Sequence, residues 1–250
     1  MPRGVTPLVQ ARHVEKRYAD GPAVVSVLSG LDLDVAPGET IAVVGESGVG
    51  KSTLLHLLGA LDQPTGGEVL FDGRDVFAQG DGELAAFRNR EIGFVFQFHH
   101  LLPDFTALEN VMLPSLIARR PFGVTRVRAA ELLERVGLKD RLHHRPGQLS
   151  GGEQQRVAVA RGVSQRPRLV LADEPTGNLD PATGEGVQQL LLELNHEHAS
   201  ALVVATHNDR LAAAMGRVLR LAGGRLADAE SPAPLPAARV GGRGGGAPCR

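Results

Sequence analysis

This sequence of 250 residues has one cysteine, no long apolar run and almost no net charge. Its single cysteine, Cys249, cannot form an intrachain disulfide, which fits a reducing compartment. The longest apolar runs are four or five residues, whereas a membrane-spanning helix needs about 20. Residues 1–10 contain no apolar run of the signal-peptide type. We therefore expect no signal peptide and no membrane span, so a role at a membrane would depend on a partner protein.

The charges of the chain nearly balance, with a formal net charge of −1 at pH 7. Nothing at this level indicates a nucleic-acid-binding protein, and we expect no nucleic acid partner. Only three of the 27 basic residues are lysine, a bias that we attribute to a GC-rich genome rather than to function. Hydrophobic residues make up 42% of the chain, which is enough for a sizeable core. The length fits one large α/β domain or two small ones.

Short apolar stretches predict the strands. Residues 5 to about 44 alternate apolar and polar residues between Gly, Pro and Asp, which predicts several short antiparallel strands. Three later runs are continuously apolar, Ile41–Val44, Leu169–Ala172 and Ala201–Ala205. Such runs are typical of central parallel strands that are buried on both faces. Because ligands of open α/β sheets bind at the carboxyl ends of the strands, the residues after each run are candidate site residues.

Helical patterns occupy much of the rest. Lys51–Leu61 has a leucine-rich face, residues 98 to 165 are mostly helical, and Pro181–His196 begins with a proline as many helices do. We interpret residues 98–165 as a helical subdomain inserted into an α/β domain that spans 5–228. Residues 229–250 are rich in Pro and Gly, and their composition predicts a disordered tail.

A phosphate-binding loop follows the first apolar run. The sequence Gly45-Glu46-Ser47-Gly48-Val49-Gly50-Lys51-Ser52 matches G-x-x-x-x-G-K-S, with Thr53 directly after it. Its glycines let backbone N–H groups surround phosphate oxygens, and the following helix directs its positive end at the anion. Lys51 is expected to reach the β- and γ-phosphates of ATP, and Ser52 to bind Mg²⁺. A glycine-rich turn with an accidental lysine is the alternative, but the flanking strand and helix favour the P-loop.

Two carboxylates follow the second apolar run. Asp173 ends the predicted strand and is expected to hold Mg²⁺, as P-loop NTPases require. Glu174 is placed to orient and deprotonate the attacking water. The alternative is that both are ordinary solvated loop carboxylates, but the neighbouring P-loop disfavours this interpretation.

Further residues carry a resemblance to a known family. Leu149-Ser150-Gly151-Gly152-Glu153-Gln154 resembles the signature of ABC ATPases, with Glu at its fifth position. Gln97 matches the Q-loop, Asn178-Leu179-Asp180 the D-loop, His207 the switch histidine and Tyr18 the aromatic that stacks on adenine. The resemblance implies a P-loop NTPase of ABC type, an α/β fold with a RecA-like core, an antiparallel β subdomain and an inserted α-helical subdomain.

The same resemblance implies a homodimer. The signature residues Ser150, Gly151, Gly152 and Glu153 open a helix and so form a second anion-binding end. In this family that end lies too far from its own P-loop to reach the same phosphate, so it binds the nucleotide of a second copy. Gln97 is expected to contact Mg²⁺ or the lytic water, and His207 to lie near the γ-phosphate. Tyr18 and Gln97 could instead be ordinary packed or strand-end residues.

The stretch after the Q-loop indicates which group within the family the chain resembles. Residues 98–111, His143-His144-Arg145-Pro146 and residues 172–180 resemble the ATP-binding subunit of the bacterial lipoprotein-releasing system (LolD-type). This implies ATP-driven release of lipoproteins from the inner membrane towards the outer membrane, by a subunit bound peripherally at the cytoplasmic face. The membrane subunits are expected to dock near Gln97–Val111, on a patch with Phe98, Leu101, Leu102 and Phe105. These apolar residues could instead only pack the helical subdomain.

Other functions remain as alternatives. ATPases of macrolide-efflux-type or cell-division ABC complexes share the same motifs. A soluble ABC ATPase that acts on ribosomes or DNA is less favoured, because the chain has one cassette and no sustained heptads. A nucleotide-binding regulator is disfavoured by Glu174 and His207.

The adjacent pairs His99-His100 and His143-His144 lack the spacing of metal ligands. Gly162 departs from the family pattern and should cost about 1 kcal/mol if it is exposed within a helix.

Overall fold

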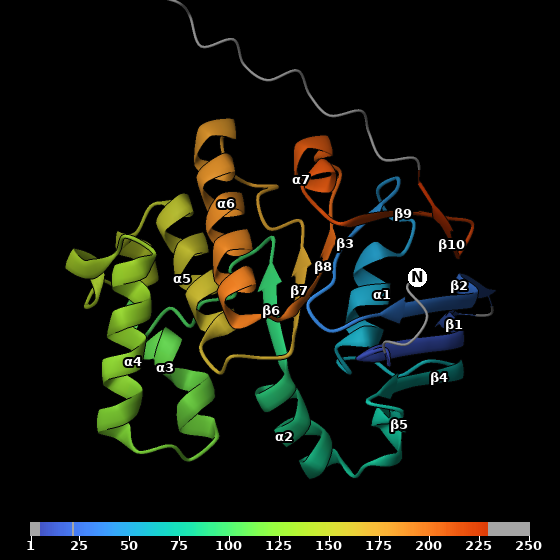
Figure 1. The fold of residues 1–250 in the computed structure, drawn as a ribbon, viewed down its shortest axis with the longest axis horizontal. Coiled ribbons are helices and arrows are strands. Elements are labelled where there is room, and N and C mark those ends of the chain that lie inside the picture. The colour runs from blue at the N-terminus through green and yellow to red at the C-terminus, as the bar shows by residue number, and fades with distance from the viewer. Residues whose placement is uncertain (1–5, 22, 230–250) are drawn as a thin grey trace, which may run out of the picture.

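Two β-sheets organise the chain (Figure 1), and the computed structural model describes residues 6–21 and 23–229. The first sheet is antiparallel, with β1 (Val9–Asp20), β2 (Ala23–Val35), β4 (Gly66–Phe71) and β5 (Arg74–Asp75) in the order β2-β1-β4-β5. The prediction for residues 5 to about 44 was right about antiparallel pairing, since β1 pairs antiparallel with β2, but wrong about strand length, because two long strands occupy most of this region. Register shifts interrupt the pairing of β1 with β2 between Ala11 and Arg17, which explains why the alternation is broken there.

The second sheet carries the predicted parallel strands. Its order is β10-β9-β3-β8-β7-β6. Neighbouring strands among β9 (Arg217–Ala222), β3 (Thr40–Val44), β8 (Ala201–Ala205), β7 (Leu169–Asp173) and β6 (Ile92–Phe96) are parallel, and β10 (Arg225–Asp228) pairs antiparallel with β9. The three apolar runs are therefore confirmed as central parallel strands.

Helices cover both faces of this sheet, and two apolar clusters fill the layers. On one face, α1 (Lys51–Leu58) packs with residues such as Ile41, Val43 and Leu171, together with the antiparallel sheet. On the other, α5 (Gly151–Val163), α6 (Pro181–His198) and α7 (Asp209–Ala213) pack with Val170 and Val204. The predicted helix from Lys51 was too long, since α1 ends at Leu58 before Gly59, and Leu61 is 48% exposed.

Three α-helices lie between β6 and β7, namely α3 (Ala107–Ile117), α4 (Phe122–Arg135) and α5. Short 3-10 turns η2 (Lys139–Arg141) and η3 (Pro146–Gln148) join α4 to α5. A further helix, α2 (Asp81–Glu91), precedes β6 and follows the 3-10 turn η1 (Val76–Ala78). The predicted tail beyond Ala229 lies outside the described residues.

Gly162 has a packing role in α5. It is half-buried, and a Cβ there would lie 3.0 Å from the carbonyl oxygen of Phe94. A Cβ on the facing Gly93 of β6 would lie 2.2 Å from the Gly162 carbonyl oxygen. The two glycines therefore let helix and strand approach closely, so the cost stated for an exposed glycine does not apply to Gly162. Over the part of the chain that the structure describes, no helix has the length and apolar character needed to cross a bilayer.

Candidate active site

The predicted site residues gather where parallel strands end. The P-loop follows β3, Asp173 is the last residue of β7, Gln97 follows β6 and His207 lies two residues after β8. These four strands are neighbours in the order β3-β8-β7-β6, and Asp173 is in register with Phe96 and with Ala205. Because parallel strands end at one edge of the sheet, residues that are far apart in sequence become neighbours.

Glycine geometry shapes the P-loop. Gly48 and Gly50 have φ angles of +77° and +111°, in the region that favours glycine. A Cβ on Gly50 would lie 2.7 Å from the Val27 side chain, so this residue has no room for one. Gly50 also precedes the first turn of α1, where Ser52 is exposed and Thr53 is half-buried. The loop thus has the conformation that directs N–H groups and a helix N-terminus at an anion.

Lys51 lies across this loop rather than in solvent. Its side chain is buried, and its Nζ donates to the carbonyl oxygens of Gly45 at 2.9 Å and Glu46 at 3.0 Å. The ammonium is therefore held beside the backbone of the loop, where a phosphate group would meet it.

Glu174 and His207 form a contacting pair. His207 Nδ1 lies 2.9 Å from Glu174 Oε1, and the His207 backbone N–H donates to Glu174 Oε2 at 3.3 Å. Glu174 adopts a left-handed φ of +44°, and its own N–H donates to the carbonyl of Ala205. The Glu174 side chain is 14% exposed and the His207 side chain 71%. The carboxylate is therefore fixed from two sides at the sheet edge, while the imidazole remains open to solvent.

Gln97 is bonded to the D-loop. Its Nε2 donates to Asn178 Oδ1 at 3.0 Å, and Asn178 Nδ2 donates back to the Gln97 carbonyl at 3.2 Å. Gly177 allows this contact, because a Cβ there would lie 3.1 Å from Gln97 Nε2. The Q-loop and D-loop residues therefore hold one another in place.

Tyr18 is anchored by residues that the sequence did not single out. Its hydroxyl donates to Asp62 Oδ2 at 2.8 Å, and Lys16 Nζ lies 4.8 Å from the ring centroid. Lys16 in turn donates to Asp62 Oδ1 at 2.6 Å. Burial raises the pKa of the Tyr18 phenol and the hydrogen bond to Asp62 raises it further, so the ring stays protonated. The ring is 40% exposed and remains accessible to a ligand.

The signature residues start α5, as predicted. Ser150 is the N-cap, the Glu153 backbone N–H donates to its Oγ, and Glu153 Oε2 accepts from the Ser150 N–H at 2.8 Å. This capping box closes the first turn. The hydrogen bond from the Ser150 backbone lowers the pKa of Glu153, which keeps the carboxylate charged. Gly152 is in tight contact with α6, since a Cβ there would lie 2.3 Å from the Thr183 side chain.

The structure separates the signature from the P-loop. Helix α1 covers one face of the parallel sheet and α5 covers the other (Figure 1). A single chain therefore brings together the P-loop, Asp173, Glu174, Gln97 and His207, whereas Ser150, Gly151, Gly152 and Glu153 form a second group beside the D-loop.

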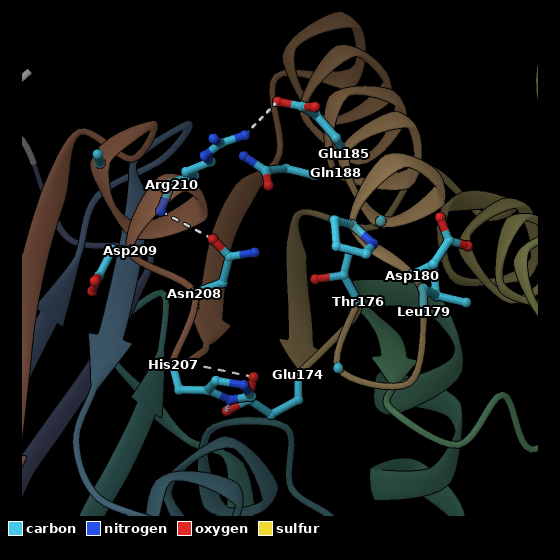
Figure 2. A pocket seen from close by; sticks show the side chains of 14 residues that line it. Glu174, Thr176, Leu179, Asp180, Glu185, Gln188, His207, Asn208, Asp209 and Arg210 are labelled. Atoms are coloured by element: carbon cyan, nitrogen blue, oxygen red, sulfur yellow. Dashed lines mark hydrogen bonds and ion pairs between the residues drawn. The ribbon is translucent and has the colours of Figure 1, made fainter. Parts of the chain in front are cut away.

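An open pocket of about 790 Å³ lies above the Glu174–His207 pair (Figure 2). The Glu174–His207 pair forms its floor, and residues of the D-loop and α6 form one wall. The opposite wall includes Asn208, which caps α7, and Arg210, which pairs with Glu185 at 3.3 Å. Neither Asn208 nor Arg210 was predicted from the sequence, because neither belongs to a recognisable motif.

A P-loop, a carboxylate at the end of a neighbouring strand and a capped glycine-rich helix start define an ATPase of the ABC type. A family model described as "ABC transporter" matches residues 28–177. The chain belongs to the ABC transporter family, as one of its ATP-hydrolysing subunits.

Curated relatives show which kind of ABC transporter subunit this chain resembles. The chain is 56% identical over 222 residues to the "Lipoprotein-releasing system ATP-binding protein LolD" of Myxococcus xanthus, a match that covers 89% of this chain and 99% of the relative. The protein of the same name from Geobacter metallireducens is 57% identical over 223 residues, with 88% and 97% covered.

Solved structures agree on the fold. The "Dimeric structure of a post-hydrolysis state of the ATP-binding cassette MJ0796 bound to ADP and Pi" has a TM-score of 0.82 and 40% identity, and covers 88% of this chain and 98% of that one. The predicted fold class is confirmed, and ATP is the nucleotide of this class of enzyme.

Proposed function

We propose that this chain is the ATP-hydrolysing subunit of an ABC transporter that releases lipoproteins from the bacterial inner membrane towards the outer membrane. The observation that carries the proposal is identity of 51–57% with LolD proteins over more than nine-tenths of their length. Identity of this extent covers the catalytic motifs and also the helical region that would meet the membrane subunits.

Catalysis is assigned to Glu174 with His207 as its partner. The Glu174 carboxylate accepts a proton from the water that attacks the γ-phosphate of ATP. His207 lies 2.9 Å from that carboxylate and holds it towards the sheet edge. Lys51 and the N–H groups of residues 45–53 bind the phosphates, and Tyr18 stacks on adenine. In this mechanism the chain contributes position, charge and one proton acceptor.

Mg²⁺ fits the residues at this edge. Ser52, Gln97 and Asp173 supply a hydroxyl, an amide and a carboxylate oxygen, the donors that Mg²⁺ prefers. Since Gln97 Nε2 donates to Asn178, the amide oxygen is the atom left for a cation. When bound, Mg²⁺ neutralises charge on the transferred phosphate group.

The second nucleotide-binding surface comes from another copy of the chain. Ser150 to Glu153 begin α5, which packs on the face of the sheet away from α1, and this separation supports a site that a second copy completes. In a two-fold dimer each P-loop meets the partner's signature helix, which gives two identical sites.

Membrane subunits are proposed to dock at the patch that follows Gln97. Phe98, Leu102 and Phe105 are 66%, 42% and 38% exposed. Arg161 of α5 connects this patch to the signature helix, because its guanidinium donates to the carbonyls of His99 at 2.8 Å and His100 at 2.7 Å. The chain would thus sit peripherally at the cytoplasmic face of the inner membrane.

Depletion of the protein in its native cell tests the proposed function. Outer-membrane lipoproteins should accumulate in the inner membrane, as measured by fractionation of the two membranes. A copy with Glu185→Gln, an exposed carboxylate in the same pocket, should restore the distribution, whereas Glu174→Gln should not. An unchanged distribution after depletion would reject lipoprotein release and favour an efflux system.

A further inference from the structure

The connection between α3 and α4 is a second exposed apolar surface. We call residues 116–128 the α3–α4 tip. Five of the large hydrophobic side chains exposed on the described chain belong to it, namely Leu116, Ile117, Phe122, Val124 and Val127. Four of the five are more than 60% exposed. So dense a cluster on the surface of a folded chain is characteristic of a binding face.

The same tip is strongly basic. It contains Arg119, Arg120, Arg126 and Arg128, and no Asp or Glu. The first three arginines are exposed. A surface that combines arginines with exposed apolar side chains, and has no acid, complements an anionic amphiphile.

A pocket of about 550 Å³ adjoins the tip, with Val124, Val127 and Arg128 in its wall. Arg166 adds a second positive charge to this pocket, and His198 also lines it. Within the described residues, neither Arg128 nor Arg166 forms an ion pair. His198 Nδ1 is buried there without a hydrogen-bond partner.

The charges around this pocket repel one another. Burial lowers the pKa of Arg128 and the charge of Arg166 lowers it further, opposed by Glu131. Burial also lowers the pKa of His198, with Arg166 and Arg128 as the next causes. Arg135 already pairs with Glu197. Among the described residues, Glu131 is the one carboxylate in the pocket wall, so a bound anion would relieve this repulsion.

Charge also distinguishes this surface from the patch after Gln97. The stretch 98–111 contains Asp104 and Glu109 and no Lys or Arg. A neutral to acidic apolar patch suits a protein helix, whereas the α3–α4 tip carries only positive charge. The two surfaces are therefore suited to different partners.

We propose that the α3–α4 tip and its pocket bind anionic phospholipids at a bilayer surface. The phosphate headgroup occupies the pocket between Arg128 and Arg166, while Phe122, Val124 and Val127 contact the acyl boundary. The proposal rests on the proposed function only in placing the chain beside a membrane. It gives the subunit a direct lipid contact in addition to its protein partner.

Co-sedimentation of the full chain with vesicles tests the proposal. The chain should bind phosphatidylglycerol-containing vesicles at low salt, bind phosphatidylcholine vesicles weakly, and dissociate as salt rises. The double variant Arg128→Gln/Arg166→Gln should lower the partition coefficient roughly 30-fold, from about 1 kcal/mol for each arginine. Phe122→Ser should lower it about tenfold through lost apolar burial.

The matched control is Arg220→Gln/Arg225→Gln, which removes two exposed arginines from β9 and β10, far from α4 (Figure 1). This control should bind vesicles like the unaltered chain. ATP hydrolysis, measured on the same preparations, should be the same in every variant as in the unaltered chain. If the unaltered chain binds anionic vesicles but does not hydrolyse ATP, the proposed function fails and the lipid site stands.

Three outcomes would overturn the lipid proposal. One is equal binding to both vesicle types, and another is equal loss of binding in the control and the Arg128/Arg166 variant. The third is saturable binding of inorganic phosphate that requires Arg128 and Arg166 without any preference for anionic vesicles, because the ligand would then be a soluble phosphate.

Discussion

At the scale of single residues, the proposed ATP hydrolysis depends on the Glu174 carboxylate. Glu174→Gln keeps the shape of the side chain but removes the proton acceptor, so ATP hydrolysis should fall by about 10²–10⁴-fold with ATP binding retained. Steady-state phosphate release and nucleotide binding measure the two effects. Glu185→Gln alters an exposed carboxylate of the same pocket and should leave both unchanged. Rapid hydrolysis by Glu174→Gln would remove Glu174 from the mechanism.

Two substitutions at Tyr18 distinguish stacking by its ring from hydrogen bonding by its hydroxyl. Tyr18→Ala removes the ring and should raise the KM for ATP by about five- to tenfold, the value of an aromatic contact of about 1 kcal/mol. Tyr18→Phe keeps the ring and loses only the hydrogen bond to Asp62, so its KM should stay close to that of the unaltered chain. Equal damage by both substitutions would assign Tyr18 to the Asp62 contact instead of to adenine.

At the scale of elements, the contact between β6 and α5 is set by glycine. Gly93→Ala places a Cβ 2.2 Å from the Gly162 carbonyl oxygen, and the backbone cannot move aside cheaply. The substitution should lower the free energy of unfolding by about 1–3 kcal/mol, visible as a lower Tm. Gly186→Ala is the matched control, because this glycine is exposed within α6 and has open space around it. It should raise stability by about 0.5–1 kcal/mol, and a Tm loss equal to that of Gly93→Ala would contradict the packing argument.

Local sequence patterns explain which helices, strands and motifs could be predicted from the sequence. Continuous apolar runs identified β3, β7 and β8, because strands buried on both faces carry a strong local signal. The P-loop and the capping box at Ser150 are short motifs with fixed geometry, so they too could be found. Strands β9 and β10 and helix α2 were missed, since their stability comes from neighbours more than from local pattern. The Tyr18–Asp62 bond joins residues 44 positions apart and leaves no local signal.

At the scale of the whole molecule, the two faces of the sheet carry the two parts of the proposed ATP site. The P-loop side of the site lies with α1 on one face, and the signature helix α5 covers the other face. A dimer also explains why a pocket of about 790 Å³ remains open between Glu174 and the D-loop in one chain. The similar cassette with bound ADP and Pi is dimeric. We therefore propose that each ATP site is built from the P-loop of one copy and the signature of another.

A mixture of two inactive variants would show whether two copies share each ATP site. Lys51→Ala disables the P-loop and Ser150→Arg blocks the signature, so each variant alone should hydrolyse almost no ATP. If monomers are mixed in equal amounts before ATP is added, half of the dimers are mixed and each of these has one intact composite site. We expect the mixture to recover roughly a quarter of the original ATPase activity. A mixture no more active than its separate components would contradict the shared site.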